Sequence, residues 1–120
     1  MNIVRTYVAQ SKINGLGLFA AADIPKGALI WRVDGLDQVL TEEELDKRHL
    51  TIEQKQYFFK YSFKANGRYT FCSDDNKYCN HSDTPNTMSD YKTQVAIKDI
   101  KKGEEITCNY NEFVEDFNGY

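Results

Sequence analysis

The chain of 120 residues has room for one domain, and its 41% apolar and 13% aromatic residues predict that it folds. Its formal net charge of −3 argues against a nucleic-acid-binding protein, which needs a concentrated basic face. The same balance is compatible with a basic partner, although on charge alone ordinary solubility is the preferred explanation. Because no apolar run approaches the ~18 residues of a membrane span and no signal-peptide core is present, we expect a soluble, intracellular protein.

The sequence A-x-x-D-I-x-K-G-x-x-I occurs twice, at residues 20–30 and 96–106. In each copy we expect the aspartate to begin a turn and the isoleucine to enter the core. The glycine, Gly27 or Gly103, should then adopt a positive φ before a strand. Two copies cannot form a repeat array, so the motif predicts a strand–turn–strand unit that is used twice.

Two short helices are expected between the copies. Capping-box sequences begin at Thr41 and Thr51, and they predict helices over Glu42–Arg48 and Ile52–Lys60. On the second helix, the spacing of Tyr57, Phe58 and Tyr61 favours a core stripe over a ligand site.

A hairpin follows, because Asn66-Gly67 lies between two aromatic, alternating runs at residues 61–63 and 68–71. The domain is therefore predicted to be mainly β with a small helical insertion. The other strands are expected at Val4–Gln10, Gly17–Ala21, Leu29–Val33, Gln94–Ala96 and Ile106–Cys108.

Three cysteines, Cys72, Cys79 and Cys108, are widely spaced and form no C-x-x-C pair. An odd number at such spacing argues against a disulfide framework and against a zinc site built from cysteines alone. Free, buried thiols in a reducing compartment are expected.

Three clusters contain the residues that could carry chemistry: I-N-G-L-G-L-F at Ile13–Phe19, Y-C-N-H-S-D-T-P-N at Tyr78–Asn86, and G-E-E-I-T-C-N-Y at Gly103–Tyr110. Taken alone, the first is compatible with a plain turn, and it lacks the third glycine of a dinucleotide fingerprint. The second is compatible with a structural polar turn, since His81 has too few neighbours for a metal site. The third is compatible with a strand that ends in a tyrosine.

In this order, the three clusters resemble the SET domain of protein lysine methyltransferases, over about Val4 to Tyr110. The two copies of the repeated motif also match strands of that family. The resemblance implies a β-clip-like SET-domain fold of several short curved sheets. It also implies a C-terminal pseudo-knot that brings Asn80-His81 beside Asn109-Tyr110. Residues 1–120 would form a single SET domain, with the helical insertion at about 41–60 and a C-terminal tail at 111–120.

The resemblance implies that the chain transfers a methyl group from S-adenosyl-L-methionine to the side-chain amine of a lysine in a protein substrate, leaves S-adenosyl-L-homocysteine, and uses no metal. Tyr110 would be catalytic, with its hydroxyl placed where the methyl group meets the lysine nitrogen. Cofactor binding would fall to Asn14, Gly15, Leu16, Tyr78, Asn80, His81 and Tyr110. The substrate channel would include Cys108 and Tyr110.

Several residues depart from the family pattern. Tyr78 replaces the usual Phe, Asp83 a frequent Cys, and Asn109 the common Asp. Cys108 is small where the family often has Phe or Tyr, so we expect methylation to proceed beyond monomethyl-lysine. No cysteine follows Tyr110, which implies that a zinc-binding post-SET module is missing.

Another group must then close the site. The expected candidates are the aromatic residues Phe113, Phe117 and Tyr120, or a second subunit in a homodimer. The expected partner is a protein with an accessible, basic, lysine-containing segment, without direct nucleic-acid or membrane contact. The expected location is the cytoplasm if the protein is bacterial, with a nucleus or a host cell as the alternatives.

Two other functions stay open. The chain could be a catalytically inactive SET-like module that binds a cofactor or a protein, although the presence of Asn80, His81 and Tyr110 argues for catalysis. It could also be a non-enzymatic β-rich domain that shares only the repeated turn, but this leaves the N-H-S-x-x-P-N cluster unexplained.

Overall fold

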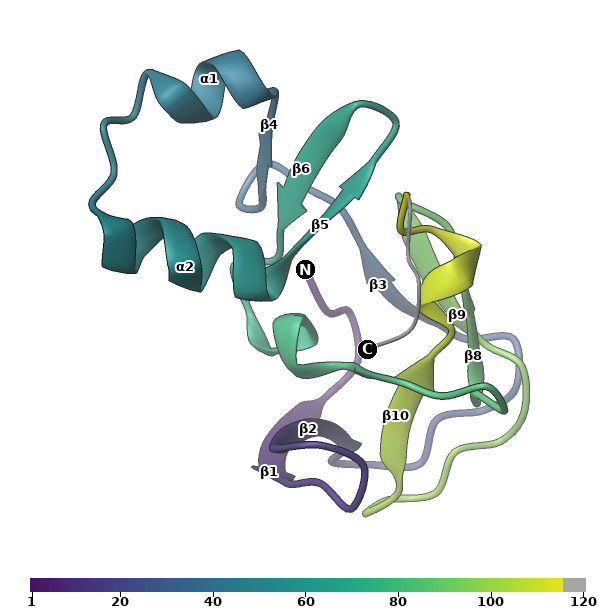
Figure 1. The fold of residues 1–120 in the computed structure, drawn as a ribbon. Helices are drawn as coiled ribbons and strands as arrows, with labels where there is room; N and C mark the ends of the chain where they lie inside the picture. Colours follow the sequence, from purple (N-terminus) through teal and green to yellow (C-terminus); the bar gives the residue numbers. More distant parts are fainter. Residues whose placement is uncertain (116–120) are drawn as a thin grey trace.

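Three small sheets form the protein in the computed structural model, which describes residues 1–115 (Figure 1). The first sheet has the order β1 (Thr6–Gln10), β2 (Leu16–Ala20), β10 (Glu105–Cys108), β7 (Asn80–His81). The second has the order β3 (Leu29–Arg32), β9 (Thr93–Ala96), β8 (Thr87–Ser89). The third has the order β4 (Gln38–Leu40), β6 (Arg68–Phe71), β5 (Ser62–Ala65). The predicted β class is confirmed, and each predicted strand lies within two residues of its expected bounds.

The two copies of the repeated motif lie antiparallel and pair at Ile24 and Ile100. Both isoleucines are buried, and Gly27 and Gly103 have φ angles of 88° and 90°. The predictions for the isoleucines and glycines are therefore confirmed.

The aspartates of the motif behave differently from the prediction. Asp23 accepts a hydrogen bond from the backbone N–H of Lys102, in the turn of the other copy, at 2.8 Å. Asp99 likewise accepts one from the N–H of Lys26 at 2.8 Å. The antiparallel arrangement brings each aspartate to the turn of the opposite copy, which is far away in the sequence.

The C-terminal strand lies beside a segment that precedes it by about a quarter of the chain, as the family resemblance implies. β7 pairs with β10 in parallel, with Asn80 opposite Thr107 and His81 opposite Cys108. The side chain of Asn86 continues this contact, since it donates to the carbonyl of Glu105 and accepts from the N–H of Thr107. These bonds hold the 80–86 segment across β10.

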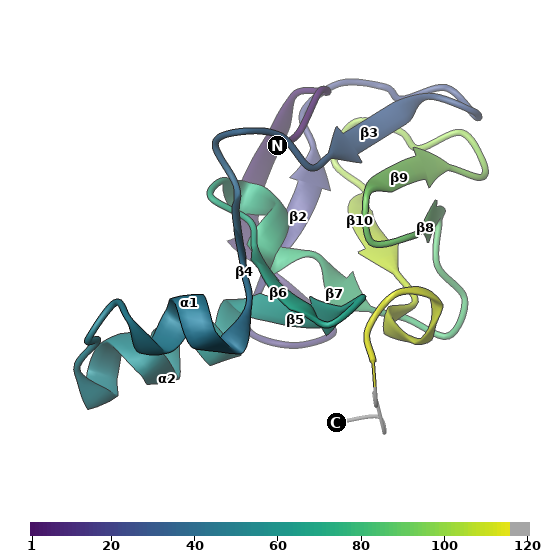
Figure 2. The same ribbon diagram turned by 90° about the horizontal axis from the view of Figure 1, so that it is seen from above.

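The helical insertion forms its own small unit at one end of the molecule (Figure 2). α1 (Glu42–Asp46) and α2 (Ile52–Tyr61) both begin with the predicted capping boxes. The first helix ends earlier than predicted, before Arg48, and His49 continues the chain with a positive φ of 53°. A second hydrophobic core, separate from the main one, contains Leu40, Leu45 and Phe58.

The aromatic stripe of α2 is core only in part. Phe58 is buried and Tyr61 is half-buried, but Tyr57 is 47% exposed, so its predicted core position is wrong. The ring of Tyr57 lies on the surface of the insertion, against the rings of Tyr61 and Phe71.

The hairpin of β5 and β6 turns at Asn66 and Gly67, whose φ angles of 53° and 72° match the predicted two-residue turn. Two short 3-10 helices, η1 (Asp75–Tyr78) and η2 (Tyr110–Glu112), flank the sheets near the predicted site. Within residues 1–115, no helix has the length and apolar character needed to cross a membrane.

Candidate functional site

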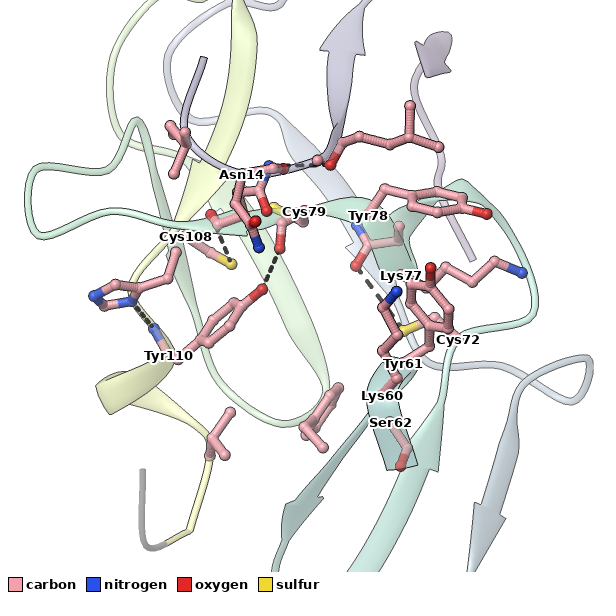
Figure 3. Close-up of a pocket in the computed structure, with 18 of the residues that line it drawn as sticks. Asn14, Lys60, Tyr61, Ser62, Cys72, Lys77, Tyr78, Cys79, Cys108 and Tyr110 are labelled. Atoms are coloured by element: carbon pink, nitrogen blue, oxygen red, sulfur yellow. Dashed lines mark hydrogen bonds between the residues drawn. The ribbon is translucent and has the colours of Figure 1, made fainter. Parts of the chain in front are cut away.

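A cavity of about 1020 Å³ opens between the loop before β2, the end of α2, η1 and the C-terminal end of β10 (Figure 3). Segments that are far apart in the sequence meet there. All eight residues that the sequence analysis assigned to the site line this cavity: Asn14, Gly15, Leu16, Tyr78, Asn80, His81, Cys108 and Tyr110.

The loop of Asn14, Gly15 and Leu16 is fastened by the side chain of Asn80. The Nδ2 group of Asn80 donates to the carbonyl oxygens of Asn14 and Leu16, both at 3.1 Å. Gly15, between them, has a positive φ of 48°, a conformation that favours glycine. The amide nitrogen of Asn80 is thus engaged with the protein itself, and this residue shapes the loop.

His81 connects β7 to η2. Its Nδ1 accepts a hydrogen bond from the backbone N–H of Tyr110 at 3.0 Å, and its Nε2 lies 2.9 Å from Oδ1 of Asp83. Because Nδ1 accepts, these partners assign the proton to Nε2, which donates to Asp83. Both ring nitrogens therefore have protein partners. Over residues 1–115, no group of three or more His, Cys, Asp or Glu side chains is arranged to hold a metal ion.

Tyr110 points its hydroxyl into the cavity, toward β7. The hydroxyl donates a hydrogen bond to the carbonyl oxygen of Cys79 at 2.5 Å, as Figure 3 shows. The ring packs edge-to-face against Phe113 at a centroid distance of 5.8 Å. Asn109, which precedes Tyr110, caps η2 by accepting from the N–H of Asn111. The position of the phenol is thus determined from both its hydroxyl and its ring.

The insertion and the hairpin supply walls that the sequence analysis missed. These residues are Phe59, Lys60, Tyr61, Ser62 and Phe63, and the cavity is also lined by Cys72, which follows the hairpin, and by Lys77 of η1. Lys77 immediately precedes Tyr78, the first residue of the second cluster, and this position could have identified it as a wall residue. Ser62 gave no such signal, yet its Oγ is buried and has no hydrogen-bond partner among the described residues.

A cation lies over an aromatic surface at this wall. The Nζ of Lys77 is 5.6 to 5.8 Å from the ring centroids of Tyr57, Phe71 and Tyr78. Such distances are within the range of attractive cation–π contacts. Lys77 and Tyr78 also line the cavity, so one end of it has a positive charge beside an aromatic ring.

The three cysteines are all free and buried, as predicted, and all three line the cavity. Burial raises the pKa of the Cys72 thiol well above its usual value. A hydrogen bond with Cys79, together with burial, also raises the pKa of Cys108. The thiols of Cys72 and Cys108 are therefore neutral near pH 7 and give this wall an apolar character.

Comparison with known proteins gives one consistent family. The family model described as the SET domain matches residues 15–111. Histone-lysine N-methyltransferase 2D of Homo sapiens is 29% identical over 122 residues, which cover 92% of this chain and 2% of that protein. Histone-lysine N-methyltransferase trr of Drosophila melanogaster is 32% identical over 130 residues, which cover 92% of this chain and 5% of that protein. The chain thus spans only a small part of the length of these relatives.

Solved structures agree in fold. A humanized mutant of the Chaetomium thermophilum Polycomb Repressive Complex 2, bound to an inhibitor, matches with a TM-score of 0.68 at 26% identity. The structure of ctPRC2 in an autoinhibited conformation bound to S-adenosylmethionine matches with the same values. Each alignment covers 94% of this chain and 16% of the other. With a family model that spans most of its length and this architecture, the chain belongs to the SET-domain family.

Proposed function

We propose that the protein is a protein-lysine N-methyltransferase that uses S-adenosylmethionine as its methyl donor. The observation that carries the proposal is the convergence of three distant segments in one cavity. The 14–16 loop, Asn80-His81 and Tyr110 all line it, in the arrangement that the family resemblance implies. The relatives named above are histone-lysine methyltransferases, which supports the same reaction class.

The size and the lining of the cavity support the proposed cofactor. Its volume of about 1020 Å³ slightly exceeds the roughly 300–1,000 Å³ of typical ligand pockets, which favours a site shared by a cofactor and a lysine side chain. The buried Oγ of Ser62 offers a polar group to a ligand. The residues that would hold the cofactor are Asn14, Gly15, Leu16, Tyr78, Asn80, His81 and Tyr110. Because the Nδ2 of Asn80 already holds the loop, we infer that Asn80 contributes mainly through its main chain.

S-adenosylmethionine, when bound, supplies a methyl group on a sulfonium ion, and the protein supplies position. We infer that Tyr110 orients the reacting groups, because its hydroxyl is held by the carbonyl of Cys79 and its ring by Phe113. Such alignment of two reactants is a large part of many enzymatic rate enhancements.

The target lysine must arrive as a neutral amine, since an ammonium group has no lone pair. The described walls near Tyr110 include Phe63, Cys108 and Phe113, which are aromatic or apolar. Transfer of an amine from water into such surroundings lowers its pKa from about 10.4. No dedicated base is then required.

The proposed substrate is a basic, lysine-containing segment of a protein, in keeping with the net charge of −3. Three apolar side chains at the cavity rim, Ile13, Leu16 and Phe59, are about half exposed and could contact it. A homodimer that covers the same rim remains a prediction, which light scattering on the purified protein tests. Of the residues expected to close the site, Phe113 lines the cavity, while Phe117 and Tyr120 lie outside the described residues.

Two measurements test the function. Calorimetric titration with S-adenosylhomocysteine should show binding, which a β-rich domain of unrelated function would not. Incubation with methyl-labelled S-adenosylmethionine and a mixed protein extract should then label lysine side chains. Binding without labelling would support the inactive module instead, and no binding would reject both SET-based functions.

A further inference from the structure

We propose that Glu105 is a positioning residue that orders the 13–16 loop for cofactor binding. Glu105 lies on β10, behind the cavity wall, and its carboxylate is half-buried. It contacts the loop through two side chains, Ser11 and Asn80, so it acts through other residues rather than on a ligand. This inference rests on the proposed function, because the loop is taken to bind S-adenosylmethionine.

The first connection runs through Ser11. The Ser11 hydroxyl lies 2.8 and 2.9 Å from the two carboxylate oxygens of Glu105 and donates its one hydrogen to them. Its oxygen then accepts from the backbone N–H of Ile13 at 2.9 Å and, less closely, from that of Asn14 at 3.4 Å. A hydroxyl whose hydrogen is held by a carboxylate presents its lone pairs in a defined direction. Glu105 therefore fixes which way the Ser11 oxygen faces, and with it the loop amides.

The second connection runs through Asn80. Its Nδ2 lies 3.0 Å from Oε2 of Glu105 and 3.1 Å from the carbonyl oxygens of Asn14 and Leu16, so the two hydrogens of this nitrogen are shared among three acceptors. The carboxylate is thus an anchor for the amide group that holds the other side of the loop. Through Ser11 the carboxylate orients backbone N–H groups of the loop, and through Asn80 it orients backbone carbonyls. The N–H groups and the carbonyls of the loop therefore both depend on the Glu105 carboxylate.

Gly17, the second glycine of the G-x-G sequence, gives an independent sign of this arrangement. A Cβ atom built on Gly17 would lie 2.5 Å from Oε2 of Glu105 and 2.9 Å from its Cδ. Unlike Gly15, Gly17 has no positive φ, so a side chain there would be opposed by lack of space, with the Cβ of Ser11 also only 3.0 Å away. β2 therefore has no side chain at the point where the carboxylate packs, which is expected if the sequence of β2 is adapted to this contact with Glu105.

The decisive variant is Glu105→Gln, which keeps the shape of the side chain but replaces one acceptor oxygen with an NH₂ group. If the NH₂ group takes the place of Oε2, Asn80 faces a donor instead of an acceptor. If it takes the place of Oε1, the remaining oxygen must accept from both Ser11 and Asn80, and the Ser11 oxygen faces a new donor. We expect the Kd for S-adenosylhomocysteine, measured by calorimetry, to rise about tenfold. With labelled cofactor, the KM for S-adenosylmethionine should rise likewise, while kcat at saturating cofactor stays within about twofold. If the contact were merely structural, its loss would lower thermal stability without raising KM selectively while kcat stays nearly constant.

Ser11→Ala is the second variant, and it removes one connection without touching β10. It should raise the same Kd, and the Ser11→Ala/Glu105→Gln double variant should lose less than the product of the two single effects. Glu104→Gln is the matched control. Its carboxylate accepts from the N–H of Lys101 and so belongs to the turn, and we expect no change in Kd.

Hydrogen exchange in the ligand-free protein separates this inference from the proposed function. The amides of Ile13 and Asn14 should exchange faster in Glu105→Gln and in Ser11→Ala than in the wild type. If the wild type does not bind S-adenosylhomocysteine, the proposed function fails and the cofactor role of Glu105 fails with it. If the wild type binds but both variants keep its Kd and its exchange rates, the proposed function stands and the role of Glu105 is overturned.

Discussion

Asp23 and Asp99 occupy equivalent places in the two copies of the repeated motif, and each closes the turn of the other copy. The exchange is reciprocal throughout. Ile24 and Ile100 trade two backbone hydrogen bonds at 2.7 and 2.8 Å, and each motif glycine donates to the first alanine of the opposite copy. The two copies of the motif therefore form the two halves of one antiparallel contact.

This contact between the two copies predicts the effect of Asp99→Ala. The variant leaves the N–H of Lys26 without its acceptor, which should lower the free energy of unfolding by about 0.5–1.5 kcal/mol in urea titrations. Asp23→Ala should have a similar effect through Lys102. Asp99→Asn keeps an acceptor oxygen and is the control, with a loss that should be clearly smaller. An Asp99→Ala protein as stable as the wild type would show that water replaces the bond at no cost.

The fold was predictable where its signals are local. Capping boxes, the Asn66-Gly67 turn and the motif glycines each involve neighbours in the chain, and each was identified. The strands β4, β7 and β8 were missed, because they are two or three residues long and exist only through pairing with distant strands. The hydrogen bond that Asp23 accepts from Lys102 was not predicted for the same reason, since Lys102 belongs to the other copy.

The motifs predicted one group of site residues, but they did not predict the residues that form the opposite wall of the cavity. The three clusters supplied eight residues that do line one cavity, and the parallel pairing of β7 with β10 explains why they meet. The opposite wall, with Tyr61 and Ser62, comes from the end of α2 and the start of the β5–β6 hairpin, where no motif marks a function. Glu105 stood inside a recognised motif, but its partner Ser11 lies near the other end of the chain.

Tyr110→Phe should reduce turnover by orders of magnitude while the fold stays intact. The change removes only the hydroxyl, which donates to the carbonyl of Cys79, and leaves the ring contact with Phe113. The stability cost should be about 0.5–1.5 kcal/mol, as for one hydrogen bond. Labelled-methyl transfer measures the turnover, and thermal unfolding monitors the fold. Tyr7→Phe, on the half-exposed ring of β1, is a control that should keep full activity. Near-normal turnover of Tyr110→Phe would remove this residue from the mechanism.

The buried thiols predict a loss of stability at alkaline pH. The pKa values of Cys72 and Cys108 are raised in the folded protein, while an unfolded thiol ionises near about 8.5. Above that pH the unfolded state loses protons that the folded state keeps, so stability that is fully present at lower pH decreases as pH rises. Each thiol should contribute up to about 1.4 kcal/mol per pH unit.

Urea titrations between pH 7.5 and 10 measure this slope. Cys72→Ala and Cys108→Ala each remove one ionising group, so each variant should show a shallower slope than the wild type, even if it is less stable at pH 7.5. A slope that both variants share with the wild type would mean that other groups cause the alkaline loss.

The last prediction concerns how many methyl groups a lysine can receive. Cys108 lines the main cavity and also a second space of about 20 Å³ behind it, which Trp31 and Gln94 border. A space of this size can hold about one water molecule. A small, weakly hydrogen-bonding side chain therefore stands between the proposed lysine channel and additional room. We expect the wild type to form di- or trimethyl-lysine at long reaction times, as measured by mass spectrometry of the substrate.

Cys108→Tyr tests this argument directly. A tyrosine adds a ring and a hydroxyl at the channel wall, so the product should shift toward monomethyl-lysine, with the first transfer slowed by less than about tenfold. Cys108→Ala keeps the wall small and should behave as the wild type does. Interiors pack densely, so neighbouring side chains could refill the gap, and the alanine variant detects this. Monomethyl-lysine as the sole product of both the wild type and Cys108→Ala would show that another wall of the channel sets the limit.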